Sequence, residues 1–250
     1  MASRWFDLPR PRVLAHRGLA LEAPENTLAA FEHAVRAGAA YLETDVHVSA
    51  DGAAVLAHDP TLERVAGRAD AVASLTMAEL RRIDLGSGHG YGTLDELLHA
   101  FPDARLNIDV KTDAAEPATI ESIRRGGAAD RVLLTSFSDA RRRRLVAALP
   151  GIATSAGRAS VLRARAASVT RSAALMRRAT TGLGALQIPE RVGRMTLLSP
   201  ALIGGAHAAG VEVHVWTVND VADMRRLLAL GIDGIVTDRA DLALRVVSGI

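Results

Sequence analysis

Two carboxylates and an imidazole alternate along residues 41–48, which read Tyr-Leu-Glu-Thr-Asp-Val-His-Val. Mostly apolar residues stand between them, and this alternation predicts a β-strand with one apolar face. Glu43, Asp45 and His47 would share the opposite face, with neighbouring side chains about 7 Å apart. Two carboxylates this close on a partly buried strand repel each other and lose hydration. A divalent cation, a basic side chain or open water must compensate them, and the apolar face makes water the weakest of the three.

Polar residues that could complete such a site stand at the ends of other short apolar runs. His16 and Arg17 follow one run, His58 follows another, and Asp109 and Lys111 end a third. If these runs are parallel strands of one sheet, their carboxyl ends meet at the same edge. Side chains far apart in the sequence would then converge, which is stronger evidence than any one motif.

The chemical types of these side chains limit the classes of reaction that the site could catalyse. Glu43, Asp45 and Asp109 are hard oxygen donors, which suit Mg²⁺ or Ca²⁺. The two histidines can act as general acid and general base because their unperturbed pKa lies near working pH. Arg17 and Lys111 offer positive charge to a phosphate. The set favours phosphoryl transfer to water over acyl transfer, since the chain has no cysteine and no serine in a nucleophile-elbow motif.

The elements that must position these groups alternate along the chain. Strands are expected at residues 12–15, 41–48, 105–111, 131–137, 152–156, 185–188, 211–216 and 232–237, with helices between most of them. Asn26 and Asn219 are expected to cap two of these helices. About eight strand–helix units predict a parallel α/β TIM barrel, with Trp216 and Asp238 at the ends of the last two strands. An open doubly wound sheet is the alternative, but it would need a glycine-rich turn after the first strand.

Residues 60–92 interrupt this pattern. They show no clear repeat, contain one expected short helix at 77–83, and include the loose Gly-Ser-Gly-His-Gly segment at 86–90. We interpret them as a small insertion after the second strand of the barrel. No linker rich in proline, glycine or serine divides the chain, so residues 1–250 are expected to form a single domain.

Composition excludes several classes of protein and of site. With no cysteine, neither disulfides nor thiolate metal sites are possible. The net charge is only +2, and the arginines are spread along several helices, so charge makes no case for a nucleic-acid partner. No run of about 18 apolar residues suggests a membrane span, and residues 1–13 lack a signal-peptide core. We expect a cytoplasmic protein without stable membrane insertion, and the sequence leaves its oligomeric state open.

Seven motifs of this chain resemble those of the glycerophosphodiester phosphodiesterase family. They are His16-Arg-Gly18, Pro24-Glu-Asn-Thr27, Glu43-Thr-Asp-Val-His47, His58-Asp59, Ile108-Asp-Val-Lys111, Val215-Trp-Thr-Val-Asn219 and Asp233-Gly-Ile-Val-Thr-Asp238. They occur in family order over almost the whole chain. The first, third and fourth are highly specific in combination.

The resemblance implies a TIM barrel with a small insertion and a small-molecule glycerophosphodiester substrate, hydrolysed to glycerol 3-phosphate and an alcohol. It implies Mg²⁺ or Ca²⁺ as cofactor, held by Glu43, Asp45 and the carboxylate at Asp109. His16 and His58 become the acid/base pair, and Arg17 and Lys111 become phosphate contacts. The family usually has glutamate where this chain has Asp109, which leaves the identity of the metal open. Trp216 is interpreted as an apolar wall for the alcohol.

Two other functions compete with hydrolysis of small diesters. One is a phospholipase D-like or lysophospholipid-acting barrel that forms a cyclic phosphate, which would need exposed apolar loops around the mouth. Residues 60–92 show little of that character. The other is a non-catalytic barrel that binds phosphodiesters, and it fits poorly with two histidines beside the carboxylates.

Overall fold

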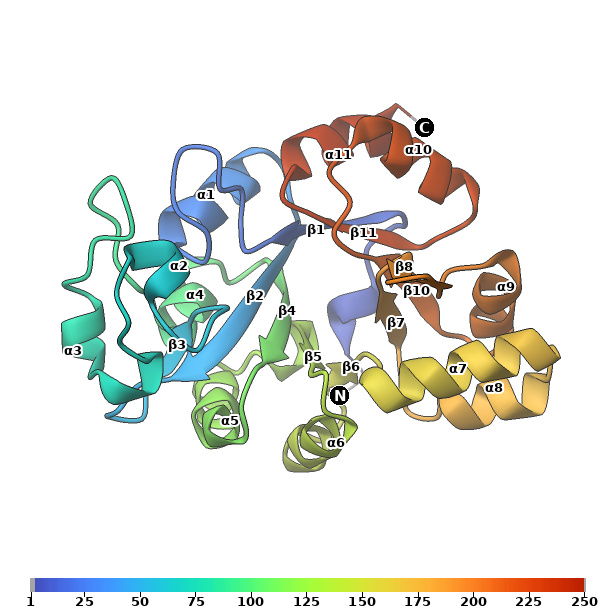
Figure 1. Cartoon of the computed structure of the whole chain (residues 1–250), viewed down its shortest axis with the longest axis horizontal. Helices are drawn as coiled ribbons and strands as arrows, with labels where there is room; N and C mark the ends of the chain where they lie inside the picture. The colour runs from blue at the N-terminus through green and yellow to red at the C-terminus, as the bar shows by residue number, and fades with distance from the viewer. Residues whose placement is uncertain (1–2, 250) are drawn as a thin grey trace.

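Eight parallel strands form the centre of the computed structural model, which describes residues 3–249. They are β1 (Arg12–His16), β2 (Tyr41–Val48), β4 (Arg105–Val110), β5 (Val132–Thr135), β6 (Ala153–Thr154), β7 (Ala185–Ile188), β10 (Glu212–Val215) and β11 (Gly234–Thr237). Their order in the sheet is β6-β5-β4-β2-β1-β11-β10-β7, and one parallel bridge from Ser155 to Ala185 joins the two end strands. The predicted TIM barrel is confirmed as a nearly closed eight-stranded barrel (Figure 1).

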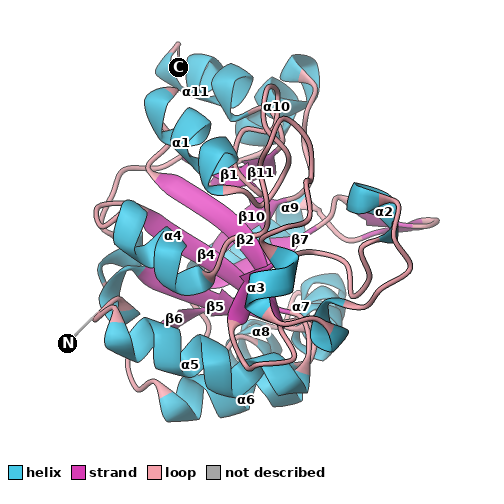
Figure 2. Cartoon of the chain, turned by 90° about the vertical axis from the view of Figure 1, so that its left-hand side faces the viewer, coloured by secondary structure: helices cyan, strands magenta, loops and turns pink. Residues whose placement is uncertain are grey.

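Helices cover the outside of the strands (Figure 2). They are α1 (Leu28–Arg36), α4 (Leu94–Ala100), α5 (Glu116–Arg125), α6 (Asp139–Ala148), α7 (Arg158–Thr170), α8 (Ala173–Ala179), α9 (Pro200–Ala208), α10 (Val221–Ala229) and α11 (Ala240–Ser248), with short 3₁₀ turns η3 (Asp113–Ala115) and η4 (Ala129–Arg131). Outward strand residues such as Leu42, Val46 and Ile108 are fully buried beneath these helices. Burial on both faces is what a parallel sheet requires.

The N-terminal segment fills the barrel end opposite the site. The 3₁₀ turn η1 (Arg4–Phe6) places Trp5 against Leu14, Tyr41 and Leu133 inside the barrel, and Trp5 is fully buried. Its indole Nε1 donates a hydrogen bond of 3.1 Å to the carbonyl oxygen of Leu106. The barrel interior is therefore packed at this end, and the space for a ligand lies at the other.

A return strand after β2 explains how His58 reaches the carboxylates. The strand β3 (Ala54–Leu56) pairs antiparallel with β2, and the backbone N–H of Ala57 donates to the carbonyl oxygen of Asp45 at 3.0 Å. The apolar run that precedes His58, residues 53–57, is therefore not one of the parallel barrel strands. It brings the chain back along β2, so that His58 arrives beside Asp45.

The chain between β3 and α4 forms short elements with their own apolar cluster. The elements are α2 (Glu63–Ala66), η2 (Val72–Ser74) and α3 (Met77–Leu80). Val55, Leu62, Leu80 and Tyr91 are buried in this cluster beside the barrel. The helix expected at 77–83 is present but shorter.

Two predicted helix caps are wrong, and the reason lies in the site. Thr27, not Asn26, caps α1 by accepting from the N–H of Ala30, and Asp220, not Asn219, caps α10. Asn26 has a backbone φ of +58° and its side chain contacts a buried carboxylate instead. Threonine and aspartate cap helices as well as asparagine does, so local sequence could not separate the neighbours.

The structure also contains elements that the sequence did not predict. The Ala- and Arg-rich stretch after β6 is helical and is divided into two helices, α7 and α8. A two-stranded hairpin, β8 (Arg191–Val192) and β9 (Met195–Thr196), forms a second sheet apart from the barrel. Strands of two residues carry too little pattern to be recognised.

Gly18 is expected to be irreplaceable because of both its backbone and its neighbours. Its φ is +89°, and an added Cβ would lie 2.6 Å from the carbonyl carbon of Ala30 in α1. Gly52 is a matched control, since its φ of +83° is similar but an added Cβ would meet nothing within 4 Å. In urea unfolding, Gly52→Ala should lose about 1–2 kcal/mol from backbone strain, and Gly18→Ala about 2 kcal/mol more. Equal losses would show that the contact with α1 is unimportant.

Candidate active site

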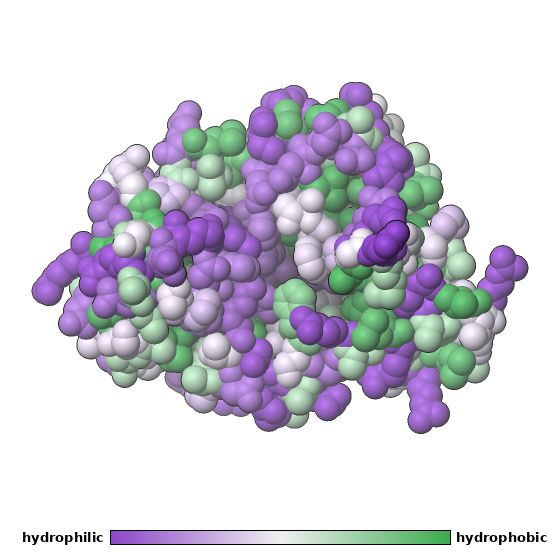
Figure 3. Space-filling model, viewed as in Figure 1, coloured by the Kyte–Doolittle hydropathy of each residue, from purple (hydrophilic) through white to green (hydrophobic). Residues whose placement is uncertain are grey.

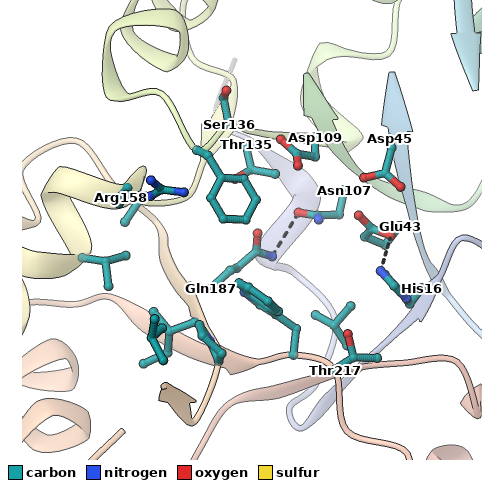
Figure 4. A pocket seen from close by; sticks show the side chains of 18 of the residues that line it. His16, Glu43, Asp45, Asn107, Asp109, Thr135, Ser136, Arg158, Gln187 and Thr217 are labelled. Carbon is teal, nitrogen blue, oxygen red and sulfur yellow. Dashed lines mark hydrogen bonds and ion pairs between the residues drawn. The ribbon is translucent and has the colours of Figure 1, made fainter. Parts of the chain in front are cut away.

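One cavity of about 640 Å³ opens at the carboxyl ends of the barrel strands, and Figure 3 shows it as a hollow near the middle of the visible face. All eight residues predicted for the site line it: His16, Arg17, Glu43, Asp45, His58, Asp109, Lys111 and Trp216. Figure 4 shows Glu43, Asp45 and Asp109 on adjoining strands, with His16 pointing toward Glu43. The predicted convergence is therefore present, while the role of each residue stays a prediction.

Basic side chains compensate the most buried carboxylate directly. Lys111 Nζ lies 2.6 Å from Asp45 Oδ1 and 2.6 Å from Asp109 Oδ2. Arg17 Nε lies 3.0 Å from Asp45 Oδ2, an ion pair without the alignment of a hydrogen bond. Burial alone would raise the pKa of Asp45, but Lys111 and Arg17 outweigh burial and lower it. Burial likewise opposes the charge on Lys111, and the two aspartates raise the pKa of its ammonium group.

The other two carboxylates are only partly compensated. Burial, followed by repulsion from Asp45, raises the pKa of Glu43 to about 7. The pKa of Asp109 is also raised, chiefly by burial, and its Oδ1 atom is buried without a hydrogen-bond partner. Arg17 and Lys111 therefore leave a deficit of positive charge at this end of the barrel.

The donor set fits a hard divalent cation, although the side chains are not arranged around one. Within residues 3–249, no three histidine or acidic side chains are placed to hold an ion together. The Lys111 ammonium group bridges Asp45 and Asp109 instead. Three carboxylates, one with an unpaired buried oxygen and one with a strongly raised pKa, are the oxygen ligands that Mg²⁺ and Ca²⁺ prefer. A cation, a basic side chain or water could compensate these carboxylates, and the structure shows basic side chains, Lys111 and Arg17, in that position.

Each candidate catalytic histidine is held by a carboxylate at Nδ1. His16 Nδ1 donates to Asp238 Oδ1 at 2.6 Å, and His58 Nδ1 donates to Asp59 Oδ1 at 2.7 Å. Within the described part of the chain, neither Nε2 atom has a hydrogen-bond partner, and that of His16 lies 3.9 Å from Glu43 Oε2. Such a carboxylate orients an imidazole and leaves its other nitrogen available for proton transfer.

Electrostatics around His16 favour its charged form. Burial lowers the pKa of His16, but the negative charge of Glu43 and the hydrogen bond to Asp238 outweigh burial and raise it. The pKa of Asp238 is lowered, first by the hydrogen bond from His16. The pair can therefore carry a proton on the imidazole.

Several residues that support the site were not predicted as part of it. Asn219 Nδ2 donates to Asp238 Oδ2 at 2.7 Å, and Asn26 Nδ2 donates to Asp45 Oδ2 at 3.3 Å. Glu25 Oε1 lies 3.0 Å from Arg17 Nη1, and the same carboxylate also forms an ion pair with Arg64 in the segment after β3. All of them stand within the sequence motifs quoted above, and that position was the only signal that could have identified them.

Two further histidines are now placed. His47 is buried outside the cavity, where its Nε2 lies 3.2 Å from the carbonyl oxygen of His58, and burial lowers its pKa. It contacts the backbone at His58 and is not among the residues that line the cavity. His89, in the segment after β3, does not line the cavity either.

The opposite side of the cavity is mainly apolar, although Arg158 also lines it (Figure 4). Its lining there includes Phe137, Val161, Leu162, Val192, Met195, Leu197 and Trp216. The rings of Phe137 and Trp216 pack edge to face, with centroids 6.0 Å apart. Asn107 and Gln187 join by a 3.0 Å hydrogen bond and also line the cavity (Figure 4). One cavity thus has a charged side built from β1, β2 and β4 and an apolar side built from later parts of the chain.

Known proteins share both the sequence and the fold. The model of the glycerophosphoryl diester phosphodiesterase family matches residues 16–242. A probable glycerophosphodiester phosphodiesterase 2 of Mycobacterium tuberculosis is 41% identical over 231 residues, which are 92% of this chain and 88% of that protein.

Solved structures agree with this relationship. A glycerophosphodiester phosphodiesterase from Agrobacterium tumefaciens is 28% identical, with a TM-score of 0.76 over 95% of this chain and 99% of its own. A phosphodiesterase from Oleispira antarctica, solved with the product sn-glycerol-3-phosphate, is 25% identical, with a TM-score of 0.80 over 96% of this chain and 97% of its own. This chain belongs to the glycerophosphoryl diester phosphodiesterase family.

Proposed function

We propose that this protein hydrolyses glycerophosphodiesters to glycerol 3-phosphate and an alcohol, with a divalent metal ion and with His16 and His58 as acid and base. The observation that carries the proposal is a single cavity that joins two carboxylate-held histidines with three buried carboxylates and two cations. Family membership and the product complex of the Oleispira antarctica relative support the substrate class.

Binding of the phosphate falls to Arg17 and Lys111. Both side chains line the cavity, and Asp109 and Asp45 raise the pKa of the Lys111 ammonium group. Their hydrogen bonds would hold the phosphate oxygens in position for attack. Glu43, Asp45 and Asp109 would hold Mg²⁺ or Ca²⁺, which when bound supplies further positive charge to the phosphate oxygens.

Proton transfer falls to the two histidines. One Nε2 accepts the proton of the attacking oxygen, from water or from the neighbouring glycerol hydroxyl, while the other donates a proton to the oxygen of the leaving alcohol. The P–O bond to the attacking oxygen forms as the bond to the alcohol breaks. Asp238 and Asp59 keep the imidazoles oriented and stabilise each ring when it is protonated.

The apolar side of the cavity favours a second candidate substrate, a lysophospholipid. Exposed apolar side chains do border the mouth, although none of them belongs to residues 60–92. Phe137, Leu162, Val192 and Met195 are between 42% and 52% exposed and line the cavity. A diester with an acyl chain could place that chain against these side chains.

Turnover of a substrate panel tests both candidates. Release of glycerol 3-phosphate from glycerophosphocholine and glycerophosphoethanolamine, and of alcohol from a lysophospholipid, would be followed with EDTA and after Mg²⁺ or Ca²⁺ is restored. We expect EDTA to abolish turnover and one of the two metals to restore it. A protein that binds these diesters but turns none of them over would be the non-catalytic barrel.

The cytoplasmic location and the lack of a nucleic-acid partner remain predictions. Among residues 3–249, none of the helices has the length and hydrophobicity that a membrane span requires.

Loss of either histidine should stop the chemistry without unfolding the protein. His16→Ala and His58→Ala are each expected to lower kcat by about 10²- to 10⁴-fold, because each removes one proton-transfer group. His99→Ala is the matched control, since His99 is an exposed residue of α4 outside the cavity. Circular dichroism would check folding, and full activity of both site variants would refute the assignment.

Glu43 should make the metal-free protein less stable as the pH rises. In the unfolded chain this carboxyl loses its proton near its ordinary pKa of 4.5, whereas the folded protein retains the proton up to about 7. The folded state therefore binds more protons, and its stability falls across that window. In EDTA, Glu43→Gln should gain about 1–3 kcal/mol over the parent between about pH 5 and pH 8. The control is Glu121→Gln at an exposed position of α5, and an identical pH dependence in all three proteins would contradict the explanation.

A further inference from the structure

The small net charge conceals a strong local excess of arginine. Residues 140–189 contain ten arginines and no aspartate or glutamate, although the whole chain carries only +2. The sequence distributes these arginines over several helices, so it made no case for a nucleic-acid partner. The structure shows which of these arginines form ion pairs with carboxylates and which of them share one surface.

Arginines before and after β6 differ in their partners. Arg141 and Arg144 of α6 pair with Asp113 and Glu116. Farther along, eight arginines form no ion pair with any carboxylate in residues 3–249. They are Arg158, Arg163, Arg165, Arg171, Arg177, Arg178, Arg191 and Arg194. Exposed charges left unpaired in this number attract an anionic partner.

A stripe of α7 joins four of the relevant side chains. Arg158, Leu162, Arg165 and Val169 are spaced by four, three and four residues, so they lie along one side of the helix. Leu162 is 48% exposed and Val169 is 66% exposed. Arginine and aliphatic side chains thus alternate along this stripe, in which Arg165 is half-buried and the other three are exposed.

The β8–β9 hairpin continues the same surface. Arg165 Nε donates to the carbonyl oxygen of Thr196 at 3.0 Å, which ties the stripe to β9. The hairpin exposes Val192 and Met195, and Arg191 and Arg194 flank them. We call the stripe of α7 and this hairpin the α7–hairpin face.

This face runs into the apolar side of the active-site cavity. Four residues of the face also line the cavity, namely Arg158, Leu162, Val192 and Met195. Six of the nine large hydrophobic side chains that are exposed in the described residues fall between Phe137 and Met195. Figure 3 shows the contrast, with hydrophobic surface broken by hydrophilic projections over α7 and mostly hydrophilic surface on the other side of the hollow.

We propose that the α7–hairpin face docks on the surface of an anionic lipid bilayer, with the apolar side of the cavity turned toward the lipid. Unpaired arginines attract anionic headgroups, and aliphatic side chains enter the boundary between headgroups and acyl chains. A nucleic acid fits less well, because single-stranded segments stack on aromatic side chains and the exposed groups of this face are aliphatic. Docking of this kind concerns binding alone, so it holds or fails independently of the proposed hydrolysis.

Sedimentation of the full chain with vesicles tests the docking. Vesicles of phosphatidylcholine with phosphatidylglycerol should bind the protein, and vesicles of phosphatidylcholine alone should bind it weakly. Arg191→Gln with Arg194→Gln should weaken binding to the anionic vesicles about 25-fold, at about fivefold per arginine. Raising NaCl from about 0.1 M to about 0.5 M should reduce that difference. Val169→Gln should weaken binding about fivefold and leave the salt dependence unchanged.

A matched double variant distinguishes the effect of arginines on this face from the effect of the protein's overall charge. Arg82→Gln with Arg225→Gln removes two other exposed arginines that lack ion pairs in the described residues, and it should leave vesicle binding unchanged. Both double variants should keep the parent's turnover of glycerophosphocholine. Equal binding to neutral and anionic vesicles, or equal losses in the two double variants, would overturn the proposal. Tighter binding of an oligonucleotide than of anionic vesicles at the same salt would overturn it in favour of a nucleic-acid partner.

Discussion

Burial of three carboxylates at one end of the barrel is the constraint on which the rest of the site depends. Glu43, Asp45 and Asp109 are each at most 6% exposed, and they lie on neighbouring strands in register. Without compensation, such burial would cost several kcal/mol for each charge. Lys111, the only lysine of the chain, and Arg17 form ion pairs with Asp45, so Asp45 is compensated more fully than Glu43 or Asp109. A divalent ion would supply the positive charge that is still missing, and a phosphate diester, itself an anion, would bind once that charge is in place.

The position of Arg17 shows how this constraint shapes the backbone. Arg17 has a φ of +56°, a conformation that non-glycine residues seldom adopt, and its N–H donates to the carbonyl oxygen of Glu43 at 2.9 Å. The next residue, Gly18, passes so close to α1 that no side chain fits. Asn26 also has a positive φ and contacts Asp45. Unusual backbone is thus gathered in the loop that delivers a cation to the buried carboxylates.

The two sides of the cavity come from different parts of the chain and suit different parts of one substrate. The first half of the chain supplies the charged groups, and the second half supplies Phe137, Leu162, Met195 and the ring of Trp216. A phosphate would lie against the first side and the alcohol against the second. The α7–hairpin face extends the apolar side outward, so a surface that binds lipid and a pocket that accepts an acyl chain would be continuous.

The sequence by itself determined the fold class, the family and eight of the residues that line the cavity. It could do so because strand alternation and motif order are local patterns, and because parallel strands bring their carboxyl ends together. Only the tertiary structure decided which charged and polar side chains form ion pairs or hydrogen bonds with one another. It assigned Asn26 and Asn219 to carboxylates rather than to helix caps, and it gave the histidines their partners Asp59 and Asp238. It also decided which arginines remain unpaired. Ion pairing and capping depend on distances between residues far apart in the chain, and those distances exist only once the barrel has formed.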